Sequence, residues 1–144
     1  MPTSTAPQSF PSLYISVWVN RDPAAAYDFL HQPENFPRWA TGLASGLRRA
    51  TDVAMDRNEW IATGPEGESR VRFTARNDFG VVDHVVVLPD GQQIAIPLRV
   101  IGNGSGSEVV LTLFRLPDMS DEILARDADW VRRDLARLKA LLEN

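Results

Sequence analysis

The chain has 144 residues, of which 44% are hydrophobic and 24% charged, and its formal net charge is −4. This size and composition predict one soluble globular domain, and the scattered basic residues predict no nucleic-acid partner. Cysteine is absent and the two histidines, His31 and His84, lie far apart, so we expect no disulfide, no thiol chemistry, no metal site and no cofactor.

Residues 1–12 are polar and rich in proline, which predicts a flexible tail before a single domain at residues 13–144. The N-terminus shows no apolar leader, and the sequence has no run of 18 apolar residues. We therefore expect a cytoplasmic protein with no membrane-spanning segment and no membrane partner.

The first part of the domain combines one strand with two short helices. Leu13–Asn20 is rich in β-branched and aromatic residues and is predicted to be a strand. Asp22 and Pro23 are typical of the start of a helix, which we expect to end near His31. Two prolines then bracket one more short turn of helix or irregular chain, which leads to Trp39.

The central part of the chain predicts a meander of six strands, because apolar and polar residues alternate along it. Turn-forming residues separate most of these strands, and connections this short make neighbouring strands antiparallel. The predicted strands are Gly46–Thr51, Glu59–Thr63, Glu68–Arg76, Val81–Leu88, Gln92–Ile101 and Glu108–Leu116.

The last segment, Ser120–Leu142, predicts a long amphipathic helix. Ser120 suits the N-cap, and Asp121 and Glu122 suit the positive end of the helix dipole. Such a helix would be roughly 34 Å long. Its apolar stripe needs an apolar surface of similar extent to pack against, and we expect the sheet to supply it. The stripe consists of Leu124, Ala128, Val131, Leu135, Leu138 and Leu142.

The order of these elements resembles that of the START-like or SRPBCC superfamily, and so do residues 22–30 (Asp-Pro-Ala-Ala-Ala-Tyr-Asp-Phe-Leu) and 33–39 (Pro-Glu-Asn-Phe-Pro-Arg-Trp). These helix-grip proteins include polyketide cyclase/dehydrase-like domains and the birch-pollen-allergen fold. The resemblance implies an α+β fold: a seven-stranded curled antiparallel sheet around the long C-terminal helix, with two short helices after the first strand. It also implies a cavity between sheet and helix for a small hydrophobic ligand, lipid-like or polyketide-like. The superfamily includes carriers as well as enzymes, so a shared fold does not fix the function.

Side-chain alternation indicates which residues face the helix. Phe73 lies on the apolar face of its strand, and a turn of two or four residues near Asn77 places His84 on the same face. A three-residue turn at residues 89–91 then places Ile96 beside His84. His84 is therefore predicted to be the one titratable group on an apolar inner face, and we take Phe73, His84 and Ile96 as candidates for ligand contact.

His84 has two interpretations. In the first it is the acid or base of the pocket, or it orients a ligand through a hydrogen bond. In the second it is a half-buried histidine whose ring bonds a backbone carbonyl or a tyrosine. Burial disfavours the imidazolium form, so we expect a neutral ring at pH 7 under either interpretation.

Four more residues are candidates for the ligand site. Trp39 and Trp60 can form flat walls at the mouth of the pocket, or can pack in the core. Asp127 lies in the half of the terminal helix that borders the cavity in the superfamily, and Arg115 is a candidate partner for its carboxylate. Exposure of Asp127 to water at the edge of the helix is the alternative.

These features favour the binding of a small, mostly apolar organic molecule. The enzymatic version of this hypothesis is a cyclase or dehydratase in which His84 moves a proton next to a carbonyl group. A non-catalytic carrier of hydrophobic metabolites is one alternative. A homodimeric protein-interaction module is another, because Val85 and Val87 lie on the outer face of their strand.

Overall fold

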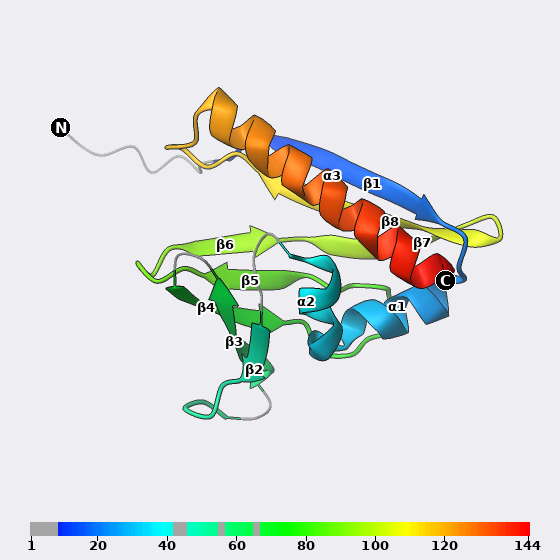
Figure 1. Ribbon diagram of the computed structural model, residues 1–144, viewed down its shortest axis with the longest axis horizontal. Coiled ribbons are helices and arrows are strands. Elements are labelled where there is room, and N and C mark those ends of the chain that lie inside the picture. The colour runs from blue at the N-terminus through cyan, green and yellow to red at the C-terminus, as the bar shows by residue number, and fades with distance from the viewer. Residues whose placement is uncertain (1–8, 42–45, 55–56, 65–66) are drawn as a thin grey trace.

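The computed structural model describes residues 9–41, 46–54, 57–64 and 67–144. The elements follow the predicted order of one strand, short helices, a run of strands and one long helix (Figure 1). They are β1 (Ser12–Val19), α1 (Pro23–His31), a 3-10 turn η1 (Pro33–Asn35), α2 (Phe36–Trp39), β2 (Gly46–Arg49), β3 (Glu59–Gly64), β4 (Gly67–Phe73), β5 (His84–Val87), β6 (Gln93–Ile96), β7 (Leu98–Asn103), β8 (Gly106–Phe114) and α3 (Asp121–Glu143). Residues 1–8 of the predicted flexible tail lie outside the described residues.

The predicted caps of the two longer helices are confirmed. The Asp22 carboxylate accepts a hydrogen bond from the Ala25 N–H at 3.3 Å, and the Ser120 hydroxyl accepts one from the Ile123 N–H at 3.2 Å. Both side chains replace hydrogen-bond partners that the first turn of a helix lacks. No helix in the described part of the chain has the length and apolar character needed to cross a membrane.

The strands form two antiparallel sheets that meet edge to edge. One sheet has the order β1-β8-β7 and the other has the order β2-β3-β4-β5-β6. Between them, the Val100 N–H donates to the Gly80 carbonyl at 2.9 Å and the Val82 N–H donates to the Leu98 carbonyl at 2.9 Å. These bonds connect β7 with the segment before β5, so the two sheets act as one curled wall.

The predicted strand Gln92–Ile101 is wrong in one respect, because Pro97 divides it into β6 and β7. Proline has no N–H to donate to a sheet and fixes its own φ angle, so it interrupts a ladder. The Pro97 carbonyl still accepts from the Thr112 N–H at 3.0 Å. The described chain therefore has eight strands where seven were predicted.

The connection between β4 and β5 is longer than predicted. The strands were expected to reach Arg76 and to resume at Val81, but they end at Phe73 and resume at His84. The Asn77 side chain takes over the pairing in this segment, since it donates to two backbone carbonyls and accepts from two backbone N–H groups. The register nevertheless matches the predicted turn of four residues, with Phe73 opposite His84.

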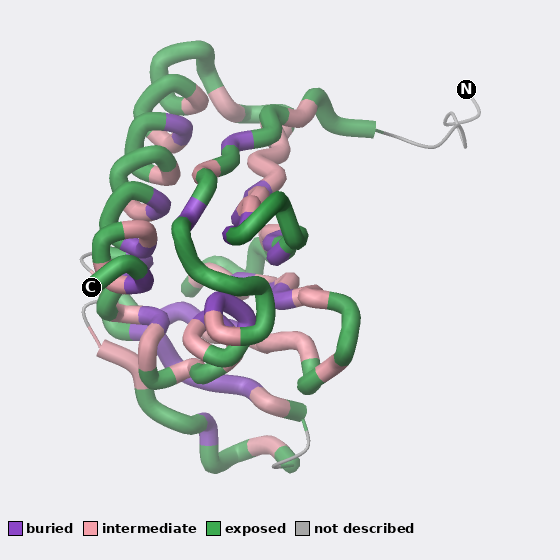
Figure 2. Tube along the Cα trace, turned by 90° about the vertical axis from the view of Figure 1, so that its right-hand side faces the viewer, coloured by how far each residue is buried: buried purple, intermediate pink, exposed green. Residues whose placement is uncertain are grey.

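The hydrophobic core lies between α3 and the inner face of the sheets. Figure 2 shows the buried residues of α3 on the side that faces the strands and exposed residues on the opposite side. At the edge of β1, the Lys139 ammonium donates to the Trp18 carbonyl at 2.8 Å, and the Glu143 carboxylate accepts from the Asn20 N–H at 2.8 Å. The buried residues of α3 are Ala128, Leu135, Leu138 and Leu142.

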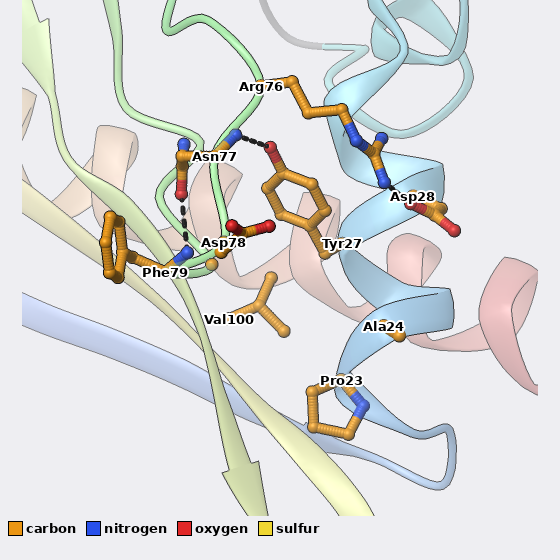
Figure 3. A pocket seen from close by; sticks show the side chains of 10 residues that line it. Pro23, Ala24, Tyr27, Asp28, Arg76, Asn77, Asp78, Phe79 and Val100 are labelled. Atoms are coloured by element: carbon orange, nitrogen blue, oxygen red, sulfur yellow. Dashed lines mark hydrogen bonds and ion pairs between the residues drawn. The ribbon is translucent and has the colours of Figure 1, made fainter.

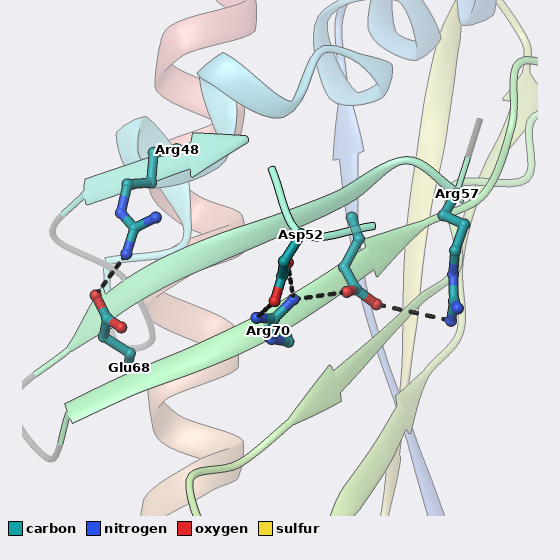
Figure 4. Close-up of polar contacts among 6 residues, drawn as sticks. Arg48, Asp52, Arg57, Glu68 and Arg70 are labelled. Carbon is teal, nitrogen blue, oxygen red and sulfur yellow. Dashed lines mark hydrogen bonds and ion pairs between the residues drawn. The ribbon is translucent and has the colours of Figure 1, made fainter. Parts of the chain in front are cut away.

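The outer face of β2, β3 and β4 is polar. Arg70 pairs with both Asp52 and the buried Glu59, while Arg48 pairs with Glu68 at 2.9 Å (Figure 4). The hydrogen bond from the Arg70 guanidinium holds the pKa of the Asp52 carboxyl below its usual range. Charged side chains therefore line this face of β3 and β4, while Trp60 and Val71 lie on the opposite face.

Candidate functional site

A pocket of about 240 Å³ lies between α3 and the inner face of the sheet. Its sheet wall is apolar and includes Ile94 and Ile96 of β6 and Leu111 and Leu113 of β8. These two strands belong to different sheets, and Pro97 interrupts the chain between β6 and β7 where the two sheets join. The pocket thus forms where the two sheets diverge beneath the helix.

The helical wall of the pocket comes from α2 and α3. Phe36 and Trp39 of α2 are both buried and border the pocket. The residues of α3 recur at steps of three and four, which puts them on one face of the helix. They are Asp127, Trp130, Val131 and Asp134.

His84 lies on the inner face of β5, as predicted. It stands opposite Phe73 on β4 and opposite Ile96 on β6. His84 is 5% exposed, and the Phe36 ring packs edge to face against its imidazole, with 5.4 Å between the two ring centroids. The pocket therefore has a buried imidazole among apolar and aromatic neighbours.

The tautomer of His84 follows from its hydrogen bond. Nδ1 lies 3.2 Å from the Val82 carbonyl oxygen, and because a carbonyl only accepts, Nδ1 carries the proton. Burial lowers the pKa of His84 to about 4, and the hydrogen bond to Val82, which raises the pKa, offsets only part of this shift. At pH 7 the ring is neutral, and Nε2 holds the lone pair.

The structure brings together four of the predicted site residues, namely His84, Trp39, Ile96 and Asp127, which all border the pocket. Phe73 does not border it. Its ring packs against the His84 ring at 5.8 Å between centroids and borders a separate hollow. Phe73 therefore lies beside His84 on the same face of the sheet.

Trp60 and Arg115 lie away from the pocket. The Trp60 indole is buried, donates to the Asn58 side chain at 3.2 Å and lies under the Arg49 guanidinium at 4.7 Å. This arrangement corresponds to the packing interpretation of Trp60, at the far end of the sheet.

The predicted pairing of Arg115 with Asp127 is wrong. Arg115 pairs with Asp121 at 2.7 Å, because the chain turns directly from the end of β8 into the first turn of α3. Asp127 instead contacts its neighbour Arg126 at 3.3 Å. The Asp127 side chain is 27% exposed, so it is neither fully in water nor buried.

Several residues of the pocket were missed in the sequence. Phe36 belongs to the same proline-bracketed segment as Trp39, and that segment could have indicated it. Asp134 and Trp130 follow Asp127 by seven and three residues, a spacing that puts all three on one side of a helix. The β8 residues give no such signal, since their strand reads like any other apolar strand.

A second hollow, of about 420 Å³, lies between α1 and residues 76–80 (Figure 3). There the Tyr27 hydroxyl accepts from the Asn77 N–H at 2.9 Å, and Arg76 pairs with Asp28 at 2.7 Å. Phe79 is 83% exposed beside it. Polar groups that bond to one another therefore line much of this hollow, whereas the pocket at His84 is mostly apolar.

Within the described residues, no group of three His, Asp or Glu side chains converges on a point where a metal ion could be held. The site therefore consists of an apolar pocket with one buried imidazole and two carboxylates at its helical wall.

No family model and no curated protein matches the chain. Solved structures do match, among them a START superfamily protein from Mycobacterium smegmatis, with 9% identity, a TM-score of 0.65, and coverage of 91% of this chain and 96% of that one. Ara h 8.0201 matches with 7% identity and a TM-score of 0.66, over 93% of this chain and 98% of that one. The chain has a START-like fold.

DynU16, a protein of the dynemicin biosynthetic locus, has the same START-like fold over part of its length. It matches with 10% identity and a TM-score of 0.66, over 91% of this chain but only 46% of its own. At identities this low the likeness concerns the fold, and what a START-like protein binds has to be argued from its own pocket.

Proposed function

We propose that the protein binds one small, largely apolar organic molecule in the pocket between α3 and the sheet. The observation that carries this proposal is the buried His84 ring beside an apolar pocket. Since Nδ1 bonds the Val82 carbonyl, Nε2 is the nitrogen that can accept a hydrogen bond from a ligand hydroxyl or N–H. A buried polar group among mostly apolar walls orients a ligand that the walls bind.

The size of the pocket limits the ligand. Its volume of about 240 Å³ lies below the roughly 300–1,000 Å³ usual for sites of drug-sized ligands. A molecule of the size of a bicyclic aromatic suits this volume better than a long acyl chain. We therefore favour a compact hydrophobic metabolite over a lipid.

Binding is better supported than catalysis. A general base works best when its pKa lies near the working pH, and burial lowers the pKa of His84 to about 4. The two carboxylates of the pocket lie on α3, whereas His84 lies on β5. A cyclase or dehydratase role for His84 is the second candidate, and it requires a ligand that raises this pKa.

Uptake of 2-naphthol, a neutral fluorescent dye with a bicyclic ring, by the full chain tests the proposal. We expect saturable binding at one site per molecule while the protein stays folded. Val131→Phe should weaken this binding at least about tenfold, because the larger ring fills the pocket. Fluorescence titration measures the affinity, and circular dichroism confirms that the variant is folded.

Ile101→Phe is the matched control for the dye titration, since Ile101 is 51% exposed and does not border the pocket. It adds a ring outside the pocket and should leave dye affinity unchanged. Absence of saturable uptake by the unchanged chain would contradict the proposal, and so would equal affinities of the unchanged chain and Val131→Phe.

His84→Leu should make the protein less sensitive to acid. The pKa of His84 is about 4 in the folded protein against 6.5 as its ordinary value, so the unfolded chain binds the proton more readily. Stability is therefore highest above pH 6.5 and decreases as the pH falls toward 4. Leucine keeps the bulk and removes the proton site, so urea unfolding should show a smaller loss between these pH values.

The same variant separates packing from ligand binding. If Nε2 accepts from a ligand, His84→Leu weakens 1-naphthylmethanol about fivefold or more but leaves 1-methylnaphthalene unchanged, since only the alcohol has a donor. Equal losses for both probes would show that the imidazole only packs.

The acid sensitivity that remains in His84→Leu includes a contribution from His31, because burial also lowers the pKa of His31.

A further inference from the structure

The hollow that Phe73 borders has a volume of about 340 Å³ and lies on the outer face of the sheet. The chain at β4, β5 and β6 borders it with three consecutive residues from each segment. The middle residues, Phe73, His84 and Ile96, stand opposite one another and have their side chains on the inner face. Their neighbours in the strands therefore have side chains on the outer face, so this outer hollow is separate from the pocket under α3.

Arg72 borders the outer hollow without a partner for its charge. It is half-buried, and its guanidinium has no hydrogen bond, ion pair or ring contact in the part of the chain that the structure describes. Glu59 stands opposite Arg72 in the ladder, but the Glu59 carboxylate is bound by Arg70 at 2.9 Å. A cation that is partly removed from water is stabilised by an anion that binds beside it.

A second guanidinium with available N–H groups borders the same hollow. Arg57 has one ion pair among the described residues, a contact of 4.0 Å with Glu59 that is too long for a hydrogen bond (Figure 4). The Arg57 side chain is 51% exposed, so this contact contributes little. Arg57 and Arg72 therefore both have donors to offer a ligand.

Among the described residues, Asp83 is the acidic side chain that borders the outer hollow, and its charge is already compensated. Its carboxylate accepts from the Leu98 N–H at 2.8 Å and from the Arg99 guanidinium through two hydrogen bonds of 2.8 Å. The charge that remains at the hollow is therefore positive. Val85 and Ala95 pair with each other across β5 and β6 and supply an apolar floor.

We propose that the outer hollow binds a small organic anion, with a carboxylate or phosphate group held by Arg72 and Arg57 and an apolar part over Val85 and Ala95. A planar guanidinium forms two parallel hydrogen bonds with either group. The volume of about 340 Å³ lies within the roughly 300–1,000 Å³ of small-molecule sites. This site is additional to the pocket under α3, which is bordered by carboxylates and by no arginine among the described residues.

1-Naphthyl phosphate and 1-naphthoate test the proposal, with inorganic phosphate as the anion without a ring. Isothermal titration of the full chain at pH 7 and low salt should show one site for each naphthyl anion. 1-Naphthyl phosphate should bind about tenfold more tightly than inorganic phosphate, since its ring contacts the apolar floor. Added salt should weaken both naphthyl anions, because screening weakens a charge interaction.

Substitutions on the outer face locate the anion. Arg72→Gln should weaken both naphthyl anions about tenfold or more, because it removes the charge and keeps a similar length. Arg57→Gln should act in the same direction. Arg48→Gln is the matched control: Arg48 lies on the same face, pairs with Glu68 at 2.9 Å and does not border the hollow. It makes the same change in net charge and should leave both affinities unchanged, and circular dichroism confirms that each variant is folded.

The outcomes distinguish this inference from the proposed function. Arg72→Gln should leave the uptake of 2-naphthol unchanged, and Val131→Phe should leave the binding of 1-naphthyl phosphate unchanged, because the two sites lie on opposite faces of the sheet. The anion site is wrong if neither naphthyl anion binds, if Arg72→Gln and Arg48→Gln weaken them equally, or if Val131→Phe abolishes their binding. Equal affinities for 1-naphthyl phosphate and inorganic phosphate would contradict an organic ligand. In each of these cases saturable uptake of 2-naphthol still supports the pocket under α3.

Discussion

Leu135→Ala is expected to lower the free energy of unfolding by about 2–5 kcal/mol, the range for a buried leucine that leaves a cavity. Leu135 is 1% exposed and lies in the middle of the buried stripe of α3. Urea denaturation followed by circular dichroism measures the change. The loss should be seen mainly as a lower midpoint at an unchanged slope, since the folded state keeps its architecture.

Arg137→Ala provides the comparison for Leu135→Ala. Arg137 lies two residues further on, on the exposed side of the same helix. Alanine preserves helix propensity there, so the free energy of unfolding should change by no more than about 0.5 kcal/mol. Equal losses at the two positions would mean that α3 is stabilised by its own backbone and that its packing against the sheet contributes little.

Gly80→Ala should also cost about 2–4 kcal/mol, for a different reason. Gly80 has a φ of +71°, and a Cβ added there would lie 2.3 Å from the Val100 carbonyl oxygen. The Gly80 carbonyl itself accepts from the Val100 N–H at 2.9 Å, at the junction of the two sheets. Alanine therefore has to push apart the backbones that connect the sheets.

Gly91→Ala separates the two causes of this effect. Gly91 has a φ of +89°, but nothing lies within 4 Å of an added Cβ. Alanine at this position has the cost of the left-handed conformation alone, about 1–2 kcal/mol. Thermal and urea unfolding of both variants should show the larger loss in Gly80→Ala, and a similar loss in the two would show that the contact with Val100 relaxes freely.

Local signals in the sequence predicted the helices and the direction of the side chains well. The caps at Asp22 and Ser120 act within three residues, so the sequence alone is sufficient to find them. His84 was placed on the inner face because each turn fixes the register of the next strand, and both turns kept that register. Pro97 is a local signal of the same kind, because a residue without an N–H interrupts the ladder between β6 and β7.

Contacts between distant segments were harder to predict. Arg115 has a long side chain just after the end of a strand, so its partner depends on the path of the chain between that strand and α3. This path brings Asp121, and not Asp127, within reach of Arg115. The residues that border the pocket come from five separate parts of the chain, and no periodicity within one element shows that Phe36 and Asp134 share a cavity. The chemistry of the pocket therefore became visible only in three dimensions.

The arrangement of β1 affects how the chain folds while it is being synthesised. β1 pairs along its whole length with β8 and is held at its free edge by Lys139 and Glu143 of α3. Its eight residues, Ser12–Val19, include no charged side chain. A nascent chain has this strand long before it has the partners that cover it.

Ribosomes add roughly 5–20 residues per second, so a separation of about a hundred residues leaves β1 without β8 for at least about five seconds. An apolar, uncharged strand pairs readily with strands of other chains during such a delay. Arrival of β8 and α3 therefore ends the interval in which β1 is open to such pairing.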